Sequence, residues 1–401
     1  MRLLLVAPTC DGEDIGEAWV TYQWVRRLAT VHDVTVLTYA KRGKSPLARQ
    51  LPGIEVVAWR EPPFMGRAER LNSLLKPGYV PFYLSARRWL RGALASGRTF
   101  DIAHQLAPVA MRYPSPLAGL SVPYVIGPVG GGLATPDGWQ AEDDTSPWYV
   151  ELRRADRWRL THDPLLRRTY EGAACVVGIG EYTRALLTGL RLRRFEVMNE
   201  TGIEQLPEPG DRREQPGPVR LLFVGRVIRT KGVRDLVRAV GLLPLGSVTL
   251  DVLGDGFDAA TCAGLASSTG VQEWVTFHGW LGRGEVEHFL RAADIFVFPS
   301  YREPGGNAVL EAMSFGLPTI VADRGGSADS VDDSCGIRIS PTTPEEYAQR
   351  IADAIADLVA DPTRRLRMGL AARERIARLY LWDSKIERMG RLYEELLTDS
   401  P

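Results

Sequence analysis

The stretch of sequence that decides the fold is residues 297–326, VFPSYREPGGNAVLEAMSFGLPTIVADRGG. The apolar run 295–298 predicts a buried strand that ends at Pro299. A loop with two glycines follows, a helix is expected to begin near Asn307, and residues 319–322 predict the next strand. This strand–loop–helix–strand order is typical of an open α/β sheet, in which ligands bind at the carboxyl ends of the strands.

The loop of this unit carries groups that suit phosphate and sugar. Gly305 and Gly306 let the backbone approach a ligand closely, and the helix behind them directs free N–H groups at an anion. Glu303 and Glu311 supply carboxylates, which accept hydrogen bonds from sugar hydroxyls. Each glutamate alone is better explained as a solvated charge. The glycines, the helix start and a second glycine pair at 325–326 together favour a ligand site.

Two cations follow the strand that we expect at residues 220–224. Arg226 and Lys231 stand five positions apart in GRVIRTKG (225–232), so a guanidinium fork and an ammonium can meet one diphosphate. Fixed cations would stabilise the charge that develops on a departing nucleoside diphosphate. Solvated loop cations are the alternative for this pair by itself. Because the chain contains no Asp-x-Asp motif, we expect neither a metal ion nor another cofactor.

Composition excludes several classes of protein. The 401 residues, 45% hydrophobic, suffice for two or three domains. Lys+Arg and Asp+Glu both number 49, so no overall charge attracts nucleic acid or a membrane. The four cysteines form no CxxC or Cys/His cluster, which disfavours a zinc site or a disulfide framework. The N-terminal apolar run is too short for a signal peptide, and no stretch reaches the ~20 apolar residues of a membrane span. We therefore expect a soluble, cytoplasmic protein with reduced thiols.

The two halves of the chain begin alike. RLLLVAP (2–8) and RLLFVGR (220–226) are each followed by a loop, a helix and a further strand, which predicts two Rossmann-like domains. The alternative is that both are merely generic buried strands. Other strands are expected at 34–38, 101–104, 122–126, 176–179 (the last of the first domain), 248–253 and 275–278, and helices at 17–29, 284–293, 344–359, 363–380 and 383–397.

The motifs resemble those of a known family. EPGGNAVLE (303–311), followed by AMSFGLPTIVADRGG, resembles the Glu-x7-Glu signature of the family 4 retaining glycosyltransferases (glycosyl transferases group 1), and GRVIRTKG resembles their phosphate-binding segment. Residues 16–29, 101–104 and 125–132 match more loosely. The resemblance implies an α/β protein of the GT-B fold, with two Rossmann-like domains facing each other across a cleft and a C-terminal helix that crosses back to the N-terminal domain. The implied parts are an acceptor-binding domain (1–204), a linker (205–219), a nucleotide-sugar-binding domain (220–380) and the returning helix (381–401).

The same resemblance implies a function. The implied protein is an enzyme that transfers a hexosyl-type sugar from a nucleoside-diphosphate-sugar, with UDP or GDP as the nucleotide. The implied acceptor is a hydroxyl of a glycan, a lipid-linked molecule or a small molecule. The resemblance also implies that the anomeric configuration is retained and that no metal is needed. Two other functions stay open: a sugar-nucleotide epimerase or hydrolase of the same fold, and a catalytically silent sugar-nucleotide-binding subunit.

Residue roles follow from the family motifs. The candidate catalytic residues are Glu303, His104, Arg226 and Lys231. The candidate donor-binding residues are Gly16, Arg226, Lys231, Gly279, Leu281, Glu303, Gly305, Gly306, Asn307, Ala308 and Glu311. This family often has His-x-His where the chain has His104-Gln105-Leu106, and a packed histidine at the end of a strand is the alternative for His104. Glu17 replaces the second glycine that often follows Gly16.

A basic stretch rich in tryptophan, residues 148–168, has two interpretations. It is either a domain helix with a solvated arginine face or an amphipathic helix that rests on anionic lipid at the inner face of the membrane. Nucleic acid is a poor third interpretation, because the net charge of the chain is zero.

Overall fold

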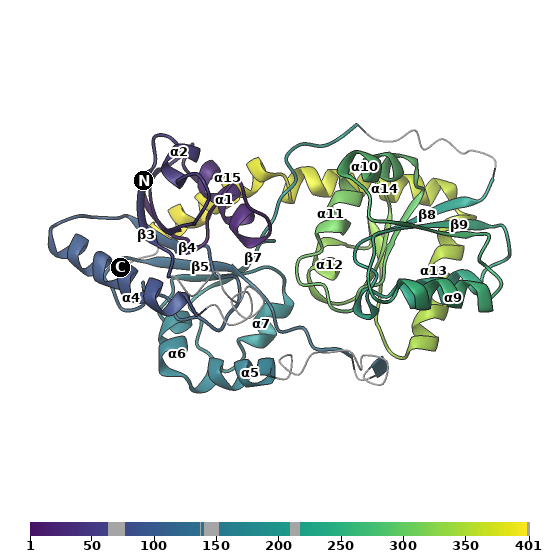
Figure 1. Ribbon diagram of the computed structural model, residues 1–401, viewed down its shortest axis with the longest axis horizontal. Helices are drawn as coiled ribbons and strands as arrows, with labels where there is room; N and C mark the ends of the chain where they lie inside the picture. The colour runs from purple at the N-terminus through teal and green to yellow at the C-terminus, as the bar shows by residue number, and fades with distance from the viewer. Residues whose placement is uncertain (63–76, 137, 140–151, 209–216, 399–401) are drawn as a thin grey trace. The chain divides into compact units, whose positions relative to one another are not determined.

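The computed structural model describes the whole chain except residues 63–76, 137, 140–151, 209–216 and 399–401. The chain forms two compact units, each an α/β unit with helices on both faces of its sheet (Figure 1). The first unit contains Met1–Gly132, Trp148–Glu200 and Ile386–Pro401, and the second contains Leu133–Pro147 and Thr201–Lys385.

In the described part of the first unit, seven parallel strands form one sheet in the order β3-β2-β1-β4-β5-β6-β7. The inner strands β1 and β4 are buried almost throughout, as expected where helices cover both faces. The strands are β1 (Arg2–Val6), β2 (Asp33–Ala40), β3 (Glu55–Arg60), β4 (Ile102–Gln105), β5 (Tyr124–Val129), β6 (Cys175–Gly178) and β7 (Phe195–Val197). The helices are α1 (Glu17–Leu28), α2 (Leu47–Gln50), α4 (Tyr79–Ala95), α5 (Leu152–His162), α6 (Pro164–Glu171) and α7 (Tyr182–Leu186).

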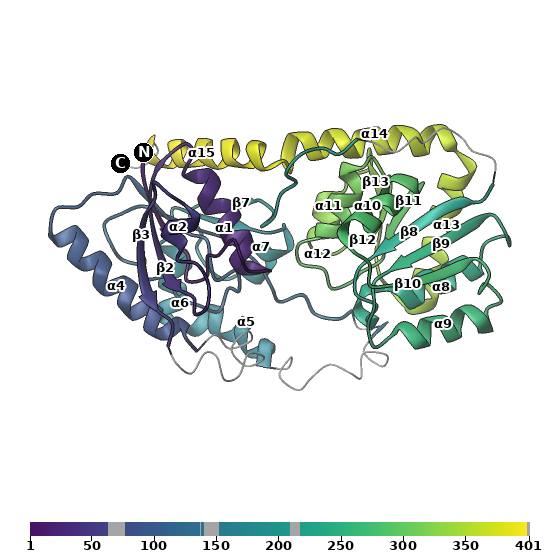
Figure 2. The ribbon, with the colours of Figure 1, turned by 45° about the horizontal axis from the view of Figure 1, so that its top comes forward.

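In the described part of the second unit, six parallel strands follow the order β10-β9-β8-β11-β12-β13. Helices α8, α9 and α13 cover one face of this sheet, and α10, α11 and α14 cover the other (Figure 2). The strands are β8 (Val219–Val224), β9 (Val248–Leu253), β10 (Val275–Gly279), β11 (Ile295–Phe298), β12 (Thr319–Ala322) and β13 (Gly336–Ile339). The helices are α8 (Val233–Gly241), α9 (Ala259–Ser268), α10 (Arg283–Ala292), α11 (Asn307–Ser314), α12 (Gly325–Ser330), α13 (Pro344–Ala360) and α14 (Pro362–Leu379), with a 3₁₀ turn, η4, at Arg229–Lys231.

The expected pair of Rossmann-like units is confirmed, and two details of the first sheet were predicted wrongly. The strand expected at 122–126 runs on to Val129, and β6 is not the last strand, because β7 pairs with it. The strand β7 is only three residues long and only partly buried, so it carries no apolar run that sequence reasoning could detect.

The boundaries between the units also differ from the expected ones. The described residues of 133–147 cluster with the second unit, although they lie within the expected N-terminal domain, and the second unit resumes at Thr201. Of the expected linker 205–219, residues 209–216 lie outside the described part of the chain.

The final helix, α15 (Trp382–Thr398), packs along the first unit from Ile386 onward. Its buried side chains recur every three or four residues, which is the spacing of one helical face. Arg194, the residue before β7, forms an ion pair with Glu395 in the last turn of α15 at 2.7 Å. The buried face consists of Trp382, Lys385, Ile386, Met389, Leu392, Tyr393 and Leu396.

Candidate active site

The candidate site lies at the carboxyl ends of β8 and β11, which are neighbours in the second sheet. The loops that follow these strands are packed against each other. Gly232 has a φ of 77°, and a Cβ on it would lie 2.3 Å from the carbonyl oxygen of Pro299. Ser300 donates its hydroxyl to the carbonyl of Thr230 at 3.2 Å. The glycine is therefore required for the two loops to meet.

The meeting of the loops brings two predicted site residues together. Lys231 forms an ion pair with Glu303, and their side chains are only 12% and 17% exposed. A second oxygen of Glu303 accepts a hydrogen bond from the backbone N–H of Gly306 at 3.1 Å. The ammonium of Lys231 also lies 5.4 Å from the centre of the Phe298 ring. A cation, a carboxylate and a backbone donor thus converge at one point.

The helix α11 begins directly at this point. Gly306 is its N-cap residue, with a φ of 73°, and Asn307 is exposed in the first turn. The second glycine pair lies behind the loop: a Cβ on Gly325 would be 2.2 Å from the carbonyl oxygen of Glu303, and that oxygen accepts a hydrogen bond from Gly326 at 3.0 Å. The pair at 325–326 therefore fixes the backbone of the Glu303 loop.

Ser327 is a buried neighbour of this loop that sequence reasoning missed. Its hydroxyl is buried and has no hydrogen-bond partner among the described groups, and it would lie 3.1 Å from a Cβ on Gly306. No motif marks this serine, since its proximity to Gly306 arises only from the packing of α12 against the loop.

Glu311 lies at the second turn of α11 in a partly buried position. Burial raises the pKa of its carboxyl above the ordinary value of 4.5, the charge of Arg283 lowers it, and the charge of Glu287 raises it. Both neighbours belong to α10, which follows the turn where Gly279 and Leu281 were predicted to contact the donor. Gly279 has a φ of 69°, and its carbonyl accepts a hydrogen bond from the N–H of Gly254 at 2.7 Å.

The two arginines near Lys231 lie in different surroundings. Arg226, predicted to bind phosphate, is exposed just after β8. Arg229, which the motif did not single out, is buried and forms two hydrogen bonds with Asp235, at 2.7 and 3.1 Å. This buried pair joins the turn that carries Lys231 to the first turn of α8.

His104, a predicted catalytic residue, lies in β4. Its side chain is fully buried in the first unit, where Nε2 lies 2.7 Å from the carbonyl of Gly127 and Nδ1 lies 2.5 Å from the hydroxyl of Tyr393. Burial lowers its pKa to about 4. With both ring nitrogens engaged, the geometry supports the alternative of a packed histidine and gives no support to the predicted catalytic role.

Other predicted residues are placed as follows. Gly16 is the N-cap residue of α1, with a φ of 65° and open space where a Cβ would be. Ala308 lies in the first turn of α11 and is partly buried. Thr201, which follows Glu200, donates its hydroxyl to the amide oxygen of Asn307 at 2.6 Å. No motif in the sequence predicts the contact between Thr201 and Asn307.

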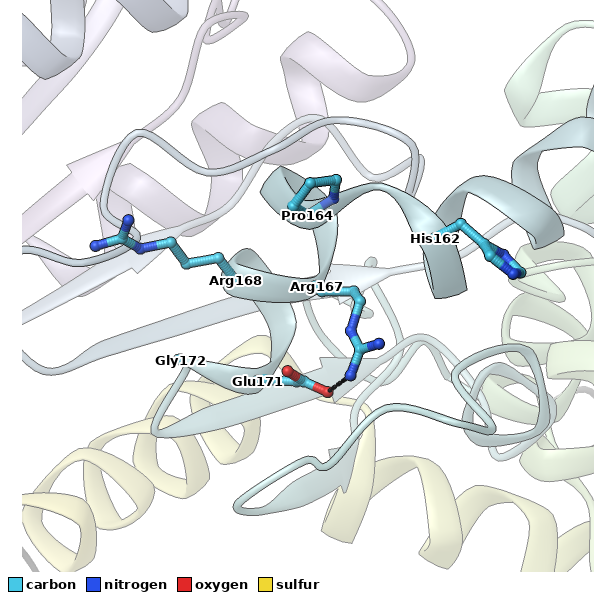
Figure 3. A pocket seen from close by; sticks show the side chains of 6 residues that line it. All are labelled: His162, Pro164, Arg167, Arg168, Glu171 and Gly172. Carbon is cyan, nitrogen blue, oxygen red and sulfur yellow. Dashed lines mark hydrogen bonds and ion pairs between the residues drawn. The ribbon is translucent and has the colours of Figure 1, made fainter.

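The basic stretch 148–168 is described only from residue 152, and the side chains of Arg153, Arg154 and Arg157 lie outside the description. A shallow depression of about 650 Å³ lies on α5 and α6 (Figure 3). Arg167 and Glu171, two of its lining residues, pair at 3.0 Å, as drawn in Figure 3. The full lining is His162, Pro164, Arg167, Arg168, Glu171 and Gly172, none of which belongs to the predicted site.

The described residues contain neither a metal-binding cluster nor a membrane-spanning helix. No group of three or more His, Cys, Asp or Glu is close enough together to hold a metal ion. No helix in the described part of the chain combines the length and the apolarity that crossing a membrane requires.

The fold matches those of solved glycosyltransferase structures. Sucrose-phosphate synthase from Thermosynechococcus elongatus aligns over 100% of both chains with a TM-score of 0.64 and 20% identity. The Anabaena protein HepE in complex with UDP aligns over 98% of this chain and 100% of its own, with a TM-score of 0.65 and 17% identity. The protein therefore has the GT-B fold.

Sequence comparison shows a similarity to a known family. Residues 207–375 match the family described as glycosyl transferases group 1. The D-inositol 3-phosphate glycosyltransferase of Corynebacterium jeikeium is 30% identical over 240 residues, which cover 57% of this chain and 54% of the relative. A GDP-mannose-dependent phosphatidylinositol monomannoside mannosyltransferase of Mycobacterium tuberculosis is 27% identical over 255 residues, 56% of this chain and 63% of its own. The match thus spans little more than half the length of these relatives.

Proposed function

We propose that the protein is a retaining glycosyltransferase that moves a sugar from a nucleoside-diphosphate-sugar to a hydroxyl acceptor without a metal ion. The observation that carries the proposal is the convergence of Lys231, Glu303 and the N–H of Gly306 at the start of α11. A cation beside a helix N-terminus suits a phosphate group, and a carboxylate next to both suits the hydroxyls of the attached sugar.

The donor would extend along the strand ends of the second unit. Lys231 and the exposed Arg226 would bind the diphosphate, with the backbone of residues 305–308 alongside it. Glu303 would accept hydrogen bonds from the sugar. Glu311 would accept them from the ribose, and the turn at 279–281 would line the nucleobase. In the absence of donor, Lys231 neutralises Glu303, so each charge keeps a partner in a site that is largely withdrawn from water.

The proposed chemistry takes place on one face of the sugar. The bond from the anomeric carbon to the departing phosphate oxygen breaks while the acceptor oxygen forms its bond on the same face. The acceptor proton passes to a phosphate oxygen of the leaving diphosphate. Negative charge grows on that diphosphate, and Lys231, Arg226 and the N–H groups at the start of α11 would stabilise it more strongly than they stabilise the ground state. This scheme requires no general base from His104.

The proposed classes of donor and acceptor are inferred from similar proteins. HepE was solved with UDP and a matched mannosyltransferase is named for GDP-mannose, which favours UDP or GDP as the nucleotide. The acceptor would be a hydroxyl of a glycan, a lipid-linked molecule or a small molecule, bound by the first unit. Contact with the inner face of a membrane, through the region of α5 and α6 where Trp158 and Leu165 are exposed, belongs to the same proposal.

A thermal-shift screen tests the donor site. UDP, GDP, ADP, dTDP and their common sugar derivatives are added to the purified protein, each with and without chelator. A ligand at 100 times its dissociation constant should add about 2.7 kcal/mol of apparent stability. We expect one base to stabilise the protein equally in both conditions. The absence of a shift with every nucleotide would contradict the proposal.

Product analysis then separates the alternatives. A transferase releases the nucleoside diphosphate much faster when its acceptor is present. An epimerase converts the sugar nucleotide without any acceptor, and a hydrolase releases free sugar at full rate in water alone. A silent subunit binds the donor and turns over nothing.

A further inference from the structure

Trp139, from the N-terminal half of the chain, is built into the core of the second unit. Its side chain has no exposed surface, and it belongs to the apolar cluster that contains Phe298 and Tyr301. The indole lies 5.1 Å from the ring of Tyr301 and 5.5 Å from the ring of Tyr347, measured between ring centres. Trp139 therefore packs directly beneath the loop that leads to Glu303.

The residues before Trp139 hold the same loop from a second side. Arg302 donates to the hydroxyl of Thr135 at 3.4 Å, and Arg324 donates to the carbonyl of Ala134 at 3.1 Å. Leu133 completes the contact, since a Cβ on Gly325 would lie 2.7 Å from one of its methyl groups. The described residues of 133–139 thus touch Tyr301, its neighbour Arg302, and Arg324 and Gly325 beside the Glu303 loop.

Tyr301 connects Trp139 with the other donor loop. The guanidinium carbon of Arg229 lies 5.7 Å from the centre of the Tyr301 ring, and Arg229 is itself held by Asp235. Tyr301 precedes Glu303 by two positions, and Arg229 precedes Lys231 by two positions. The ring of Tyr301, in the Glu303 loop, therefore contacts Arg229 in the Lys231 loop, and Trp139 packs against the same ring.

Such an arrangement affects more than stability. A catalytic group acts only when its support holds it within a fraction of an ångström of its working position. The ion pair of Lys231 and Glu303 joins the two loops, and the ring of Tyr301 in one loop lies against Arg229 of the other. If the indole is removed, Tyr301 can shift into the vacated space. Lys231 and Glu303 are then no longer held in their relative positions.

We propose that Trp139 is a positioning residue of the donor site, which holds Tyr301 and thereby sets Lys231 and Glu303 for the diphosphate and sugar of the donor. This inference rests on the proposed function. It assigns the described residues of 133–139 to the support of the donor site, whereas the sequence placed them in the acceptor-binding domain.

The test compares the diphosphate and monophosphate forms of one nucleotide. Wild type, Trp139→Phe and Trp139→Ala are titrated by calorimetry with UDP, GDP and ADP, and then with the monophosphate of whichever base binds. Because Trp139 acts on the loops of Lys231 and Glu303 and not on the turn at 279–281, the Ala variant should lose on the order of tenfold in diphosphate affinity. Its monophosphate affinity should stay within about twofold, and Trp139→Phe should restore the diphosphate affinity.

Controls separate positioning from folding. Leu245→Ala removes an exposed apolar side chain from the turn between α8 and β9 and should leave both affinities unchanged. If Trp139→Ala does not fold, Trp139→Leu keeps an apolar side chain there and takes its place. A purely structural role would lower the melting temperature while the ratio of the two affinities stays at the wild-type value, and this result would overturn the inference. Failure of the wild type to bind any diphosphate would instead overturn the proposed function.

Discussion

The Nδ1 atom of His104 lies 2.5 Å from the hydroxyl of Tyr393, a residue 289 positions later in the chain. The carbonyl of Gly127 can only accept a hydrogen bond, so Nε2 of His104 carries the proton and Nδ1 accepts from Tyr393. The contact joins β4 to α15, so His104 helps to hold the last helix against the first unit.

The first prediction concerns the dependence of stability on pH. Burial lowers the pKa of His104 to about 4 from an ordinary value of 6.5. As the pH falls through 6.5, the unfolded chain binds a proton at this residue and the folded chain does not. Stability should therefore fall between about pH 6.5 and pH 4, by up to about 3 kcal/mol from this residue. Urea unfolding of wild type and His104→Gln across this range measures the effect.

The His104→Gln variant should show a shallower loss of stability in that range. His162→Gln, which changes an exposed histidine, should keep the slope of the wild type. Equal slopes for wild type and His104→Gln would mean that the buried histidine does not titrate as we infer.

The second prediction concerns the two cations. Lys231→Ala and Arg226→Ala should each lower turnover by about 100- to 1,000-fold, because each removes a fixed charge from the departing diphosphate. Release of the nucleoside diphosphate from the donor found in the screen provides the rate. Arg350→Ala removes an exposed cation from α13 and serves as the control. Near-normal rates in both cation variants would refute the assignment.

The third prediction concerns Glu311. If its carboxylate accepts hydrogen bonds from the ribose, donor affinity needs the ionised form, and burial raises the pKa at which that form is lost. Affinity should therefore weaken as the pH is lowered, beginning at a higher pH than it would for an ordinary glutamate. Glu311→Gln should bind more weakly at neutral pH and lose this dependence. Calorimetric titration of wild type and Glu311→Gln with the donor at several pH values measures the effect. An unchanged pH profile in Glu311→Gln would contradict the proposed contact of Glu311 with the ribose.

The fourth prediction concerns the glycine between the two donor loops. Gly232→Ala places a Cβ 2.3 Å from the carbonyl oxygen of Pro299 in a residue with a φ of 77°. The left-handed conformation alone costs about 1–2 kcal/mol, and the loops must also separate. We expect lower stability in urea and a loss of diphosphate binding. Gly264→Ala lies in α9 with open space around it and should stabilise by about 0.5–1 kcal/mol. Two variants of equal stability would show that the loops do not depend on this close approach.

The fifth prediction concerns metal ions. Since the proposed site relies on Arg226 and Lys231 to balance the diphosphate, turnover should be unchanged when the enzyme is dialysed against excess chelator and assayed in it. Restoration of a lost rate by Mg²⁺ or Mn²⁺ would show that the cations do not suffice.

The sequence by itself determined the two Rossmann-like units and the glycine-containing loops of the candidate site. The apolar runs of β1, β8 and β11 mark parallel strands covered on both faces, and the glycines near Glu303 mark a loop that must bend sharply and approach closely. These are local properties, in which a residue and its near neighbours in the chain suffice to specify the conformation.

Only the tertiary structure decided which residues support that loop and which are withdrawn from it. His104 has the residue type and strand position of a catalytic group, yet Gly127 and Tyr393 occupy both its nitrogens. Trp139 lies among residues expected to serve the acceptor, yet it packs against Tyr301. Such contacts join residues that are far apart in the chain, and their partners are set by how whole elements pack. No local spacing in the sequence records that choice.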